Sequence, residues 1–331
     1  MTRLFTDGAE AGDQKFWTYV YQGGVSTDER SGTYSYYFGY SGQYGYKNLP
    51  YNVSEFYFRT GFKVNSTNTF LRFYDVAGAA GNTVFYLSLP AGFLSYSIGG
   101  ITTTSGSNAC SLSVWNLLEI HLKIHDTLGV FEAKLNGIDD AYYTGNTKAY
   151  AAGTVACFYV RTPGAAGATT YVDDMAFNDA NGTDDNSWCG DGHIIKISPD
   201  GEGDTLQWTP STGTTHYTLV DEIPPSGGTD YVTTNIPGYR DMYHMSAYSS
   251  TGKSIRRIWS EVRAKDNQAV GAAINLGIKT SSGSVILSSA SAILTSNYDS
   301  IKGEEFLVNP EDGQPWEGTD IDNIQFVVEA E

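Results

Sequence analysis

Alternation of apolar and polar residues is the feature that most constrains what this chain can fold into. Short alternating runs recur along the sequence, and Gly, Asn, Asp and Ser residues bound them. The run 118–124 places aliphatic side chains on one face and polar ones on the other, as in a half-buried antiparallel strand. The pattern predicts an all-β chain with two antiparallel β-sandwich (jelly-roll) domains in tandem. Further strands are expected at 56–64, 69–74, 84–89, 130–135, 193–197, 255–265, 273–279, 285–289 and 324–329.

The length and one change in composition indicate where the domains divide. A chain of 331 residues is long enough for two domains. The stretch 178–187 is polar, rich in Asn and Asp, and has no periodicity, which is typical of a linker. We therefore predict a first domain at 1–178, a linker at 179–190 and a second domain at 191–331.

The charge excludes several classes of function. The 37 Asp and Glu residues outnumber the 20 Lys and Arg residues, so the formal net charge is −17. A nucleic-acid binder needs a surplus of cations for phosphate contacts, and an anionic membrane surface attracts basic segments. No apolar stretch reaches the roughly 20 residues that span a bilayer. We expect neither nucleic-acid binding nor membrane insertion.

The N-terminus and the cysteines indicate the compartment of synthesis. The opening residues contain no apolar core of a secretory signal, so we expect none. Cys110, Cys157 and Cys189 are odd in number, far apart and without CxxC spacing. Neither a disulfide framework nor a zinc ribbon is supported, and the expected site of synthesis is a reducing cytoplasm.

Motifs that could carry catalysis are weak. His121 and His125 are four residues apart, but on a strand they lie about 13 Å apart, so two surface histidines are expected rather than a zinc site. The triplet Glu119-Ile120-His121 resembles the catalytic strand of some jelly-roll lyases, yet their companion Arg and Tyr motifs are not recognisable. The run 247–254 fits a loose P-loop, but a strand-like run follows it. We expect no enzymatic activity.

Acidic residues at the two ends of the first domain suggest a metal site. Glu10 lies near the start of the chain, and Asp173 and Asp174 lie in its last predicted strand. The first and last strands of a jelly roll often pair, which would bring these carboxylates together. Hard oxygen ligands suit a structural Ca²⁺. The alternative is that the three residues are turn-capping or solvated acids.

Tyrosines are concentrated in one stretch. Tyrosine combines a flat apolar face with a polar tip, so these residues could stack on sugar rings or fill a subunit interface. The remaining alternative is a hairpin packed on its own domain. The tyrosines concerned are Tyr34, Tyr36, Tyr37, Tyr40, Tyr44, Tyr46 and Tyr51.

The middle of the first domain resembles a known fold family. Residues 115–124 continue to 129–137, which ends in Asn-Gly, and together they are similar to the central hairpin of laminin-G/concanavalin A-like jelly rolls. The acidic end segments resemble those of carbohydrate-binding jelly rolls, in which such acids hold a structural calcium. The resemblance implies the same for this domain.

Residues 186–192, 199–204, 207–213 and 216–222 form a series of short motifs after the first domain. The series resembles structural proteins of tailed bacteriophages, which join a laminin-G-like domain to a second β domain. The resemblance implies a non-catalytic virion protein, tail-associated or a capsid decoration, made in the host bacterial cytoplasm. Other virion proteins, further copies of the chain and a host-surface glycan are the implied partners. The alternatives are a secreted or surface carbohydrate-binding module and a phage polysaccharide depolymerase.

Overall fold

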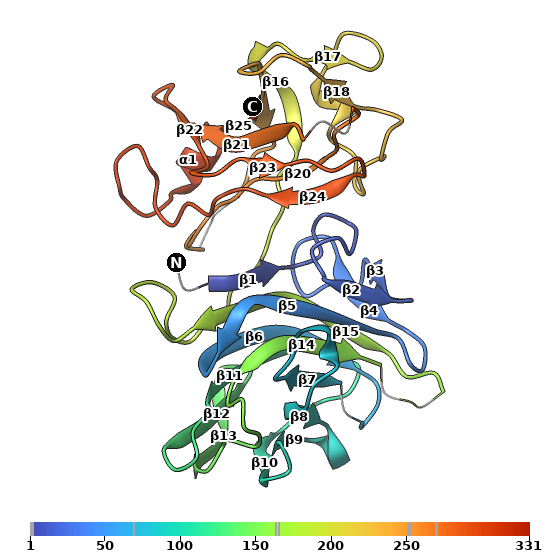
Figure 1. The fold of residues 1–331 in the computed structure, drawn as a ribbon, viewed down its shortest axis with the longest axis vertical. Coiled ribbons are helices and arrows are strands. Elements are labelled where there is room, and N and C mark those ends of the chain that lie inside the picture. Colours follow the sequence, from blue (N-terminus) through green and yellow to red (C-terminus); the bar gives the residue numbers. More distant parts are fainter. Residues whose placement is uncertain (1–2, 69, 163, 165, 250–252, 269–270) are drawn as a thin grey trace. The chain divides into compact units, whose positions relative to one another are not determined.

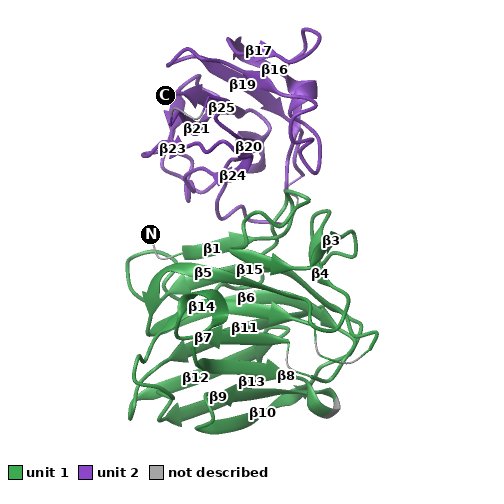
Figure 2. Cartoon of the chain, turned by 45° about the vertical axis from the view of Figure 1, so that its right-hand side comes forward, with its two compact units in different colours: residues 1–195 green, residues 196–331 purple. Residues whose placement is uncertain are grey.

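The structure is a computed structural model that describes residues 3–331 except residues 69, 163, 165, 250–252 and 269–270. It divides into two compact units, residues 1–195 (unit 1) and 196–331 (unit 2), as Figure 2 shows. Antiparallel sheets make up both units, so the predicted all-β class is confirmed. The described helical segments are short: η1 (Ala77–Ala79), η2 (Pro90–Gly92), η3 (Tyr217–Leu219) and α1 (Gly318–Ile321).

Sheet A of unit 1 has eight strands (Figure 1). Their order is β13-β12-β11-β6-β15-β4-β3, and β1 also pairs with β15. β1, the first strand of the chain, therefore pairs with β15, the last strand of unit 1 in sequence, as in the predicted jelly roll. The strands are β1 (Arg3–Asp7), β3 (Gly24–Ser26), β4 (Ser35–Phe38), β6 (Glu55–Val64), β11 (Asn116–Lys123), β12 (Gly129–Leu135), β13 (Ile138–Gly145) and β15 (Thr170–Asp179).

Sheet B of unit 1 has seven strands in the order β10-β9-β8-β7-β14-β5-β2. All of its pairings are antiparallel. The strands are β2 (Tyr19–Tyr21), β5 (Tyr44–Val53), β7 (Leu71–Tyr74), β8 (Thr83–Ser88), β9 (Phe93–Ile98), β10 (Thr102–Ala109) and β14 (Val155–Arg161).

Phenylalanine side chains from both sheets form the core of unit 1. Phe58 on β6 and Phe158 on β14 are fully buried, and their ring centroids lie 5.5 Å apart. Phe158 also contacts Phe5, Trp17 and Phe177 at centroid distances of 5.2, 5.7 and 6.3 Å. Because side chains alternate along a strand, every residue that points into this core sends its neighbours to an outer face.

Unit 2 is smaller and has shorter strands. Its main sheet follows the order β16-β19-β25-β21-β22, with β23 paired to β21. Two further pairs are β17-β18 and β20-β24. The strands are β16 (Pro199–Leu206), β17 (Thr209–Pro210), β18 (Val232–Thr233), β19 (Arg240–Met245), β20 (Glu261–Ala264), β21 (Ala273–Lys279), β22 (Val285–Leu287), β23 (Ala292–Ile293), β24 (Asp299–Lys302) and β25 (Gln325–Ala330).

Most predicted strands are present, and one is absent. The run 273–279 has the bounds of β21, and 56–64 lies within β6. Residues 193–197 were predicted as a strand, which is wrong: the backbone N–H of Ile194 donates to the Asp174 carboxylate instead of to a strand partner.

Three further expectations from the sequence concern the linker, the P-loop-like run and membrane insertion. The predicted linker 179–190 lies within unit 1. Of the P-loop-like run 247–254, residues 250–252 lie outside the described residues. No helix in the described part of the chain is long and apolar enough to cross a membrane.

Truncation of the central core ring tests this packing. Phe158→Ala removes a fully buried ring that contacts four other aromatic rings. We expect the free energy of unfolding to fall by about 3–5 kcal/mol, measured by urea unfolding. The control is Tyr40→Ala, at a side chain 71% exposed, which should change it by less than about 0.5 kcal/mol. Equal losses in the two variants would contradict the assignment.

Candidate functional site

A row of polar and aromatic side chains crosses the outer face of sheet B. Cross-strand register places Tyr46 beside Tyr159, Tyr159 beside Arg72, and Arg72 beside Tyr86. Tyr19 extends the row beyond Tyr46. The residues that alternate with them in these strands pack in the core, so the row faces outward. We call the tyrosines on this surface the tyrosine face; they are Tyr19, Tyr21, Tyr44, Tyr46, Tyr74, Tyr86 and Tyr159.

The tyrosines stack on one another across neighbouring strands. Tyr44 on β5 lies 5.6 Å from Tyr21 on β2 and 5.0 Å from Tyr159 on β14, with the rings within 25° of parallel. Tyr74 on β7 meets Tyr159 edge-on at 5.8 Å. Four adjacent strands thus supply a continuous aromatic surface about 15 Å across, given the usual strand spacing.

The face is open at one end and more enclosed towards the middle of the sheet. Tyr19 and Tyr21 are 44% and 43% exposed, whereas Tyr74 is 7% exposed. Burial raises the pKa of Tyr159 to about 12, and the charges of Arg161 and Arg72 act in the opposite direction. Burial also raises the pKa of Tyr44, as do Tyr19, Tyr46 and Tyr21. The phenols of Tyr44 and Tyr159 are therefore neutral hydrogen-bonding groups at physiological pH.

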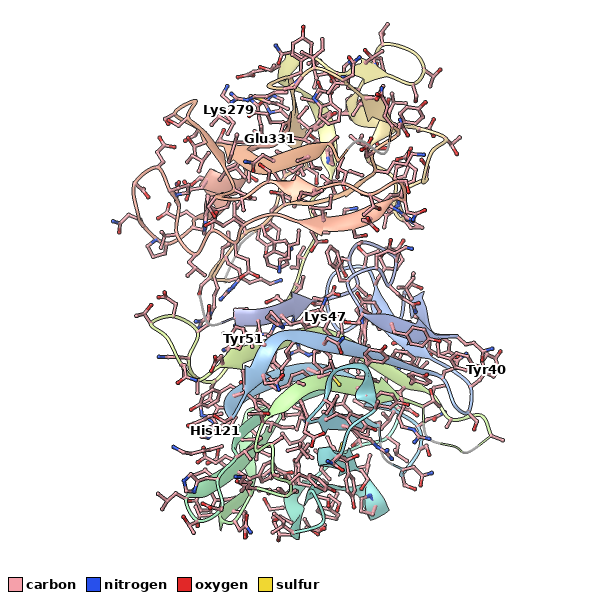
Figure 3. All side chains as sticks on the ribbon, in the orientation of Figure 1. Tyr40, Lys47, Tyr51, His121, Lys279 and Glu331 are labelled. Atoms are coloured by element: carbon pink, nitrogen blue, oxygen red, sulfur yellow. The ribbon has the colours of Figure 1, made fainter. Side chains whose placement is uncertain are left out.

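The structure disperses the tyrosines that the sequence analysis grouped. Tyr44 and Tyr46 are on the tyrosine face, whereas Tyr36 is buried and donates to Asp7. Tyr34 packs partly buried against the core. The others are Tyr37, which contacts Tyr171 on sheet A, and Tyr40 and Tyr51, which lie at opposite ends of the sheets in Figure 3.

Five of the seven tyrosines of this face lie outside the tyrosine-rich stretch 34–51 and were not predicted from the sequence. Tyr19 and Tyr21 share strand β2, and Tyr74, Tyr86 and Tyr159 lie on three further strands that are far apart in the sequence. A signal was present, because each sits at an outward position of an alternating strand. Only the strand order of sheet B brings these positions together.

The predicted metal ligands have hydrogen-bond donors in this structure. Glu10 accepts from the backbone N–H groups of Thr33 and Tyr34 at 3.0–3.1 Å. Asp173 accepts from the backbone N–H groups of Arg30, Ser31 and Asp174 at 2.7–3.2 Å.

Asp174 accepts from the Arg30 guanidinium at 2.6 Å and from the Ile194 N–H at 2.7 Å. Burial and the Asp174 charge raise the pKa of Asp173. Among the described residues, no three His, Cys, Asp or Glu side chains are grouped to hold a metal ion. The structural Ca²⁺ stays a prediction.

Part of the outer face of sheet A is covered by a later segment of the chain. The Trp188 ring lies 5.5 Å from the Tyr57 ring and 6.2 Å from His121. Gly190, two residues after Trp188, donates its backbone N–H to the Glu119 carboxylate at 2.7 Å. The 187–194 segment therefore lies over the face that carries the lyase-like triplet.

This cover corrects one expectation. His121 was expected on the surface but is 7% exposed. Its ring stacks on Tyr57 at 4.3 Å, and its nitrogens lie 2.8 Å from Glu132 and 3.1 Å from Glu55. The strand pattern placed it on the polar face, but the segment that buries it is distant in sequence.

Comparisons with known proteins concern the fold. No protein-family model matches the chain, and no curated protein matches its sequence. A glucuronan lyase from Trichoderma reesei is similar in structure, with 17% identity, a TM-score of 0.43, and coverage of 54% of this chain and 96% of that one.

Two other solved structures are similar at this level. A carbohydrate esterase from the Shiga toxin-encoding bacteriophage phi24B has 14% identity and a TM-score of 0.40, covering 54% of this chain and 98% of that one. A carbohydrate-binding module from Bacillus subtilis has 10% identity and a TM-score of 0.32, covering 50% and 96%. The similar structures are thus carbohydrate-active or carbohydrate-binding folds.

These findings correct the expectation of no enzymatic activity. That expectation is wrong, because the similar structures include a glucuronan lyase, a carbohydrate esterase and an alginate lyase. The expectation rested on missing sequence motifs, and catalytic side chains can be assembled from separate strands without leaving a local motif.

The pH dependence of the free energy of unfolding tests the burial of Tyr159. The unfolded chain ionises this phenol near pH 10, whereas the folded protein holds it neutral to about pH 12. Between these values the folded state binds one more proton, so the free energy of unfolding falls as pH rises. Tyr159→Phe should lessen this fall, measured by urea unfolding at about pH 9 and about pH 11. Tyr142→Phe, on sheet A, is the control, and the same fall in both variants would contradict the assignment.

A second measurement tests the calcium prediction. A Ca²⁺ bound only by the folded protein raises the melting temperature. The prediction requires the melting temperature to rise with added calcium and to fall with chelator. An unchanged melting temperature in both conditions would contradict it.

Proposed function

We propose that unit 1 binds a polysaccharide on the tyrosine face. The single observation that carries the proposal is the continuous row of outward-facing tyrosines across neighbouring strands of sheet B. An aromatic ring offers a flat apolar surface to the C–H face of a sugar, and the phenol offers a hydrogen bond to its hydroxyls. A flat surface several rings long suits a polymer better than a single small molecule.

The geometry also prepares the face for binding. Tyrosine loses little conformational freedom when it is immobilised, because it has only two side-chain torsions. Here the rings already stack on one another, with Tyr44 between Tyr21 and Tyr159. Less ordering remains for the ligand to impose, and pre-organisation of this kind raises affinity.

The setting in which this face acts is a second part of the proposal. The resemblance to bacteriophage structural proteins supports a place on a virion, where the face would meet a glycan of the host surface. A carbohydrate-binding module outside a virion is the alternative, and the tyrosine face is compatible with either. Immunogold labelling of purified phage particles distinguishes the two settings.

A substitution at the centre of the stack tests the binding proposal. Tyr44→Ala removes the ring between Tyr21 and Tyr159, and we expect affinity to fall about tenfold, close to the energy of one aromatic contact. Calorimetric titration with a panel of bacterial polysaccharides measures it. The matched control is Tyr142→Ala, at a tyrosine 64% exposed on sheet A.

Two results would contradict the proposal. One is that the wild-type chain binds no polysaccharide of the panel. The other is that Tyr44→Ala and Tyr142→Ala weaken binding equally. The same panel, assayed for released reducing or unsaturated ends, reports whether binding is accompanied by turnover.

A further inference from the structure

Charge is divided unequally between the two sheets of unit 1. No Asp or Glu lies in any of the seven strands of sheet B, in a chain with 37 acidic residues. The strands of sheet A contain many: Asp7, Glu55, Glu119, Glu132, Asp139, Asp140, Asp173, Asp174 and Asp179. The tyrosine face is thus built on strands without acids in an acidic protein.

Two arginines occupy this surface. Arg72 on β7 lies beside Tyr159 in the cross-strand register, and Arg161 lies two residues beyond Tyr159 on β14. The positive charges of both arginines act to lower the pKa of Tyr159. The remaining cation of these strands, Lys47, donates to the Phe16 carbonyl and lies over the Phe5 ring.

Neither arginine has a carboxylate partner within the described residues. The Arg72 guanidinium donates to the Tyr74 hydroxyl at 3.3 Å, and its buried Nε has no hydrogen-bond partner. Arg161 donates from Nε to the Thr162 carbonyl at 3.4 Å. Elsewhere in unit 1, by contrast, Arg30 pairs with Asp174 and Asp191.

The nearest acid along β7 does not compensate these charges. Asp75 follows Tyr74 directly but is 5% exposed. Its carboxylate accepts from the backbone N–H and the side-chain amide of Asn82, at 2.7 and 2.9 Å. Among the described residues, the terminal guanidinium nitrogens of Arg72 and Arg161 therefore have no acidic partner and can pair with a ligand, whereas the buried Nε of Arg72 cannot.

We infer that the ligand of the tyrosine face is an acidic polysaccharide, whose carboxylates pair with Arg72 and Arg161 while its sugar rings lie on the tyrosines. This inference rests on the proposed function and adds the chemical class of the glycan. A guanidinium binds a carboxylate through two parallel hydrogen bonds. Because the strands of sheet B contain no acids, they lessen the local repulsion that a protein of net charge −17 exerts on an anionic polymer.

Other occupants fit the face less well. Single-stranded nucleic acid also stacks on aromatic rings, but it needs a cationic groove along the backbone, and this face supplies two arginines. A second copy docked by twofold symmetry would bring the same unpaired arginines of both copies onto one interface. A neutral glycan would leave their charges unpaired.

The test compares acidic polymers with their neutralised forms. The probes are polygalacturonate, polyglucuronate and alginate, each also with its carboxyl groups methyl-esterified. We expect the full chain to bind at least one acid form about tenfold or more tightly than its ester, a preference that declines as salt is raised. Arg72→Gln and Arg161→Gln should each remove most of this preference. The charge-matched control is Lys123→Gln on sheet A, which should retain it.

The contrary results distinguish a failure of this inference from a failure of the proposed function. Equal binding of acid and ester forms, lowered by Tyr44→Ala, would overturn the acidic ligand and leave the glycan site standing. Binding of neither form, nor of any neutral polysaccharide, would overturn both. Tighter binding of oligo(dT) than of every polyuronate, or dimerisation through this face, would also overturn the inference. Thermal melting shows whether each variant is folded. The two arginines lie on different strands, so if one variant unfolds, the other still tests the inference.

Discussion

Packing of phenylalanine rings between two sheets is the interaction on which the rest of unit 1 depends. Phe58 and Phe158, one from each sheet, meet in the centre of the core. Their burial fixes which residues of each strand point inward, and a shift of one residue in register would reverse every side chain. The outward direction of Tyr44 and Tyr159 is therefore a consequence of the core, and the core holds the tyrosine face in place.

The two outer faces that result differ in chemistry. Sheet A has an acidic outer side over which the 187–194 segment lies, with Trp188 on Tyr57 and Gly190 on Glu119. Sheet B has a tyrosine face free of acids, with Arg72 and Arg161 among the rings. Charge and aromatic character are thus combined on one face, and the proposed ligand follows from both together.

The sequence predicted the fold better than it predicted the site. Period-2 alternation is local, so strands such as β21 and β6 were predictable from single stretches. The tyrosine face depends on strand order, which brings Tyr19 beside Tyr46 and Tyr159 beside Arg72. The burial of His121 depends on a segment about 65 residues later in the chain, and no local pattern reports such a contact.

The most direct test of the account is a crystal structure of the chain with an oligosaccharide of an acidic polymer that it binds. We predict sugar rings along the row from Tyr19 to Tyr86, with carboxylates within hydrogen-bond distance of Arg72 and Arg161. Sugar bound on the outer face of sheet A, or on unit 2 alone, would contradict it.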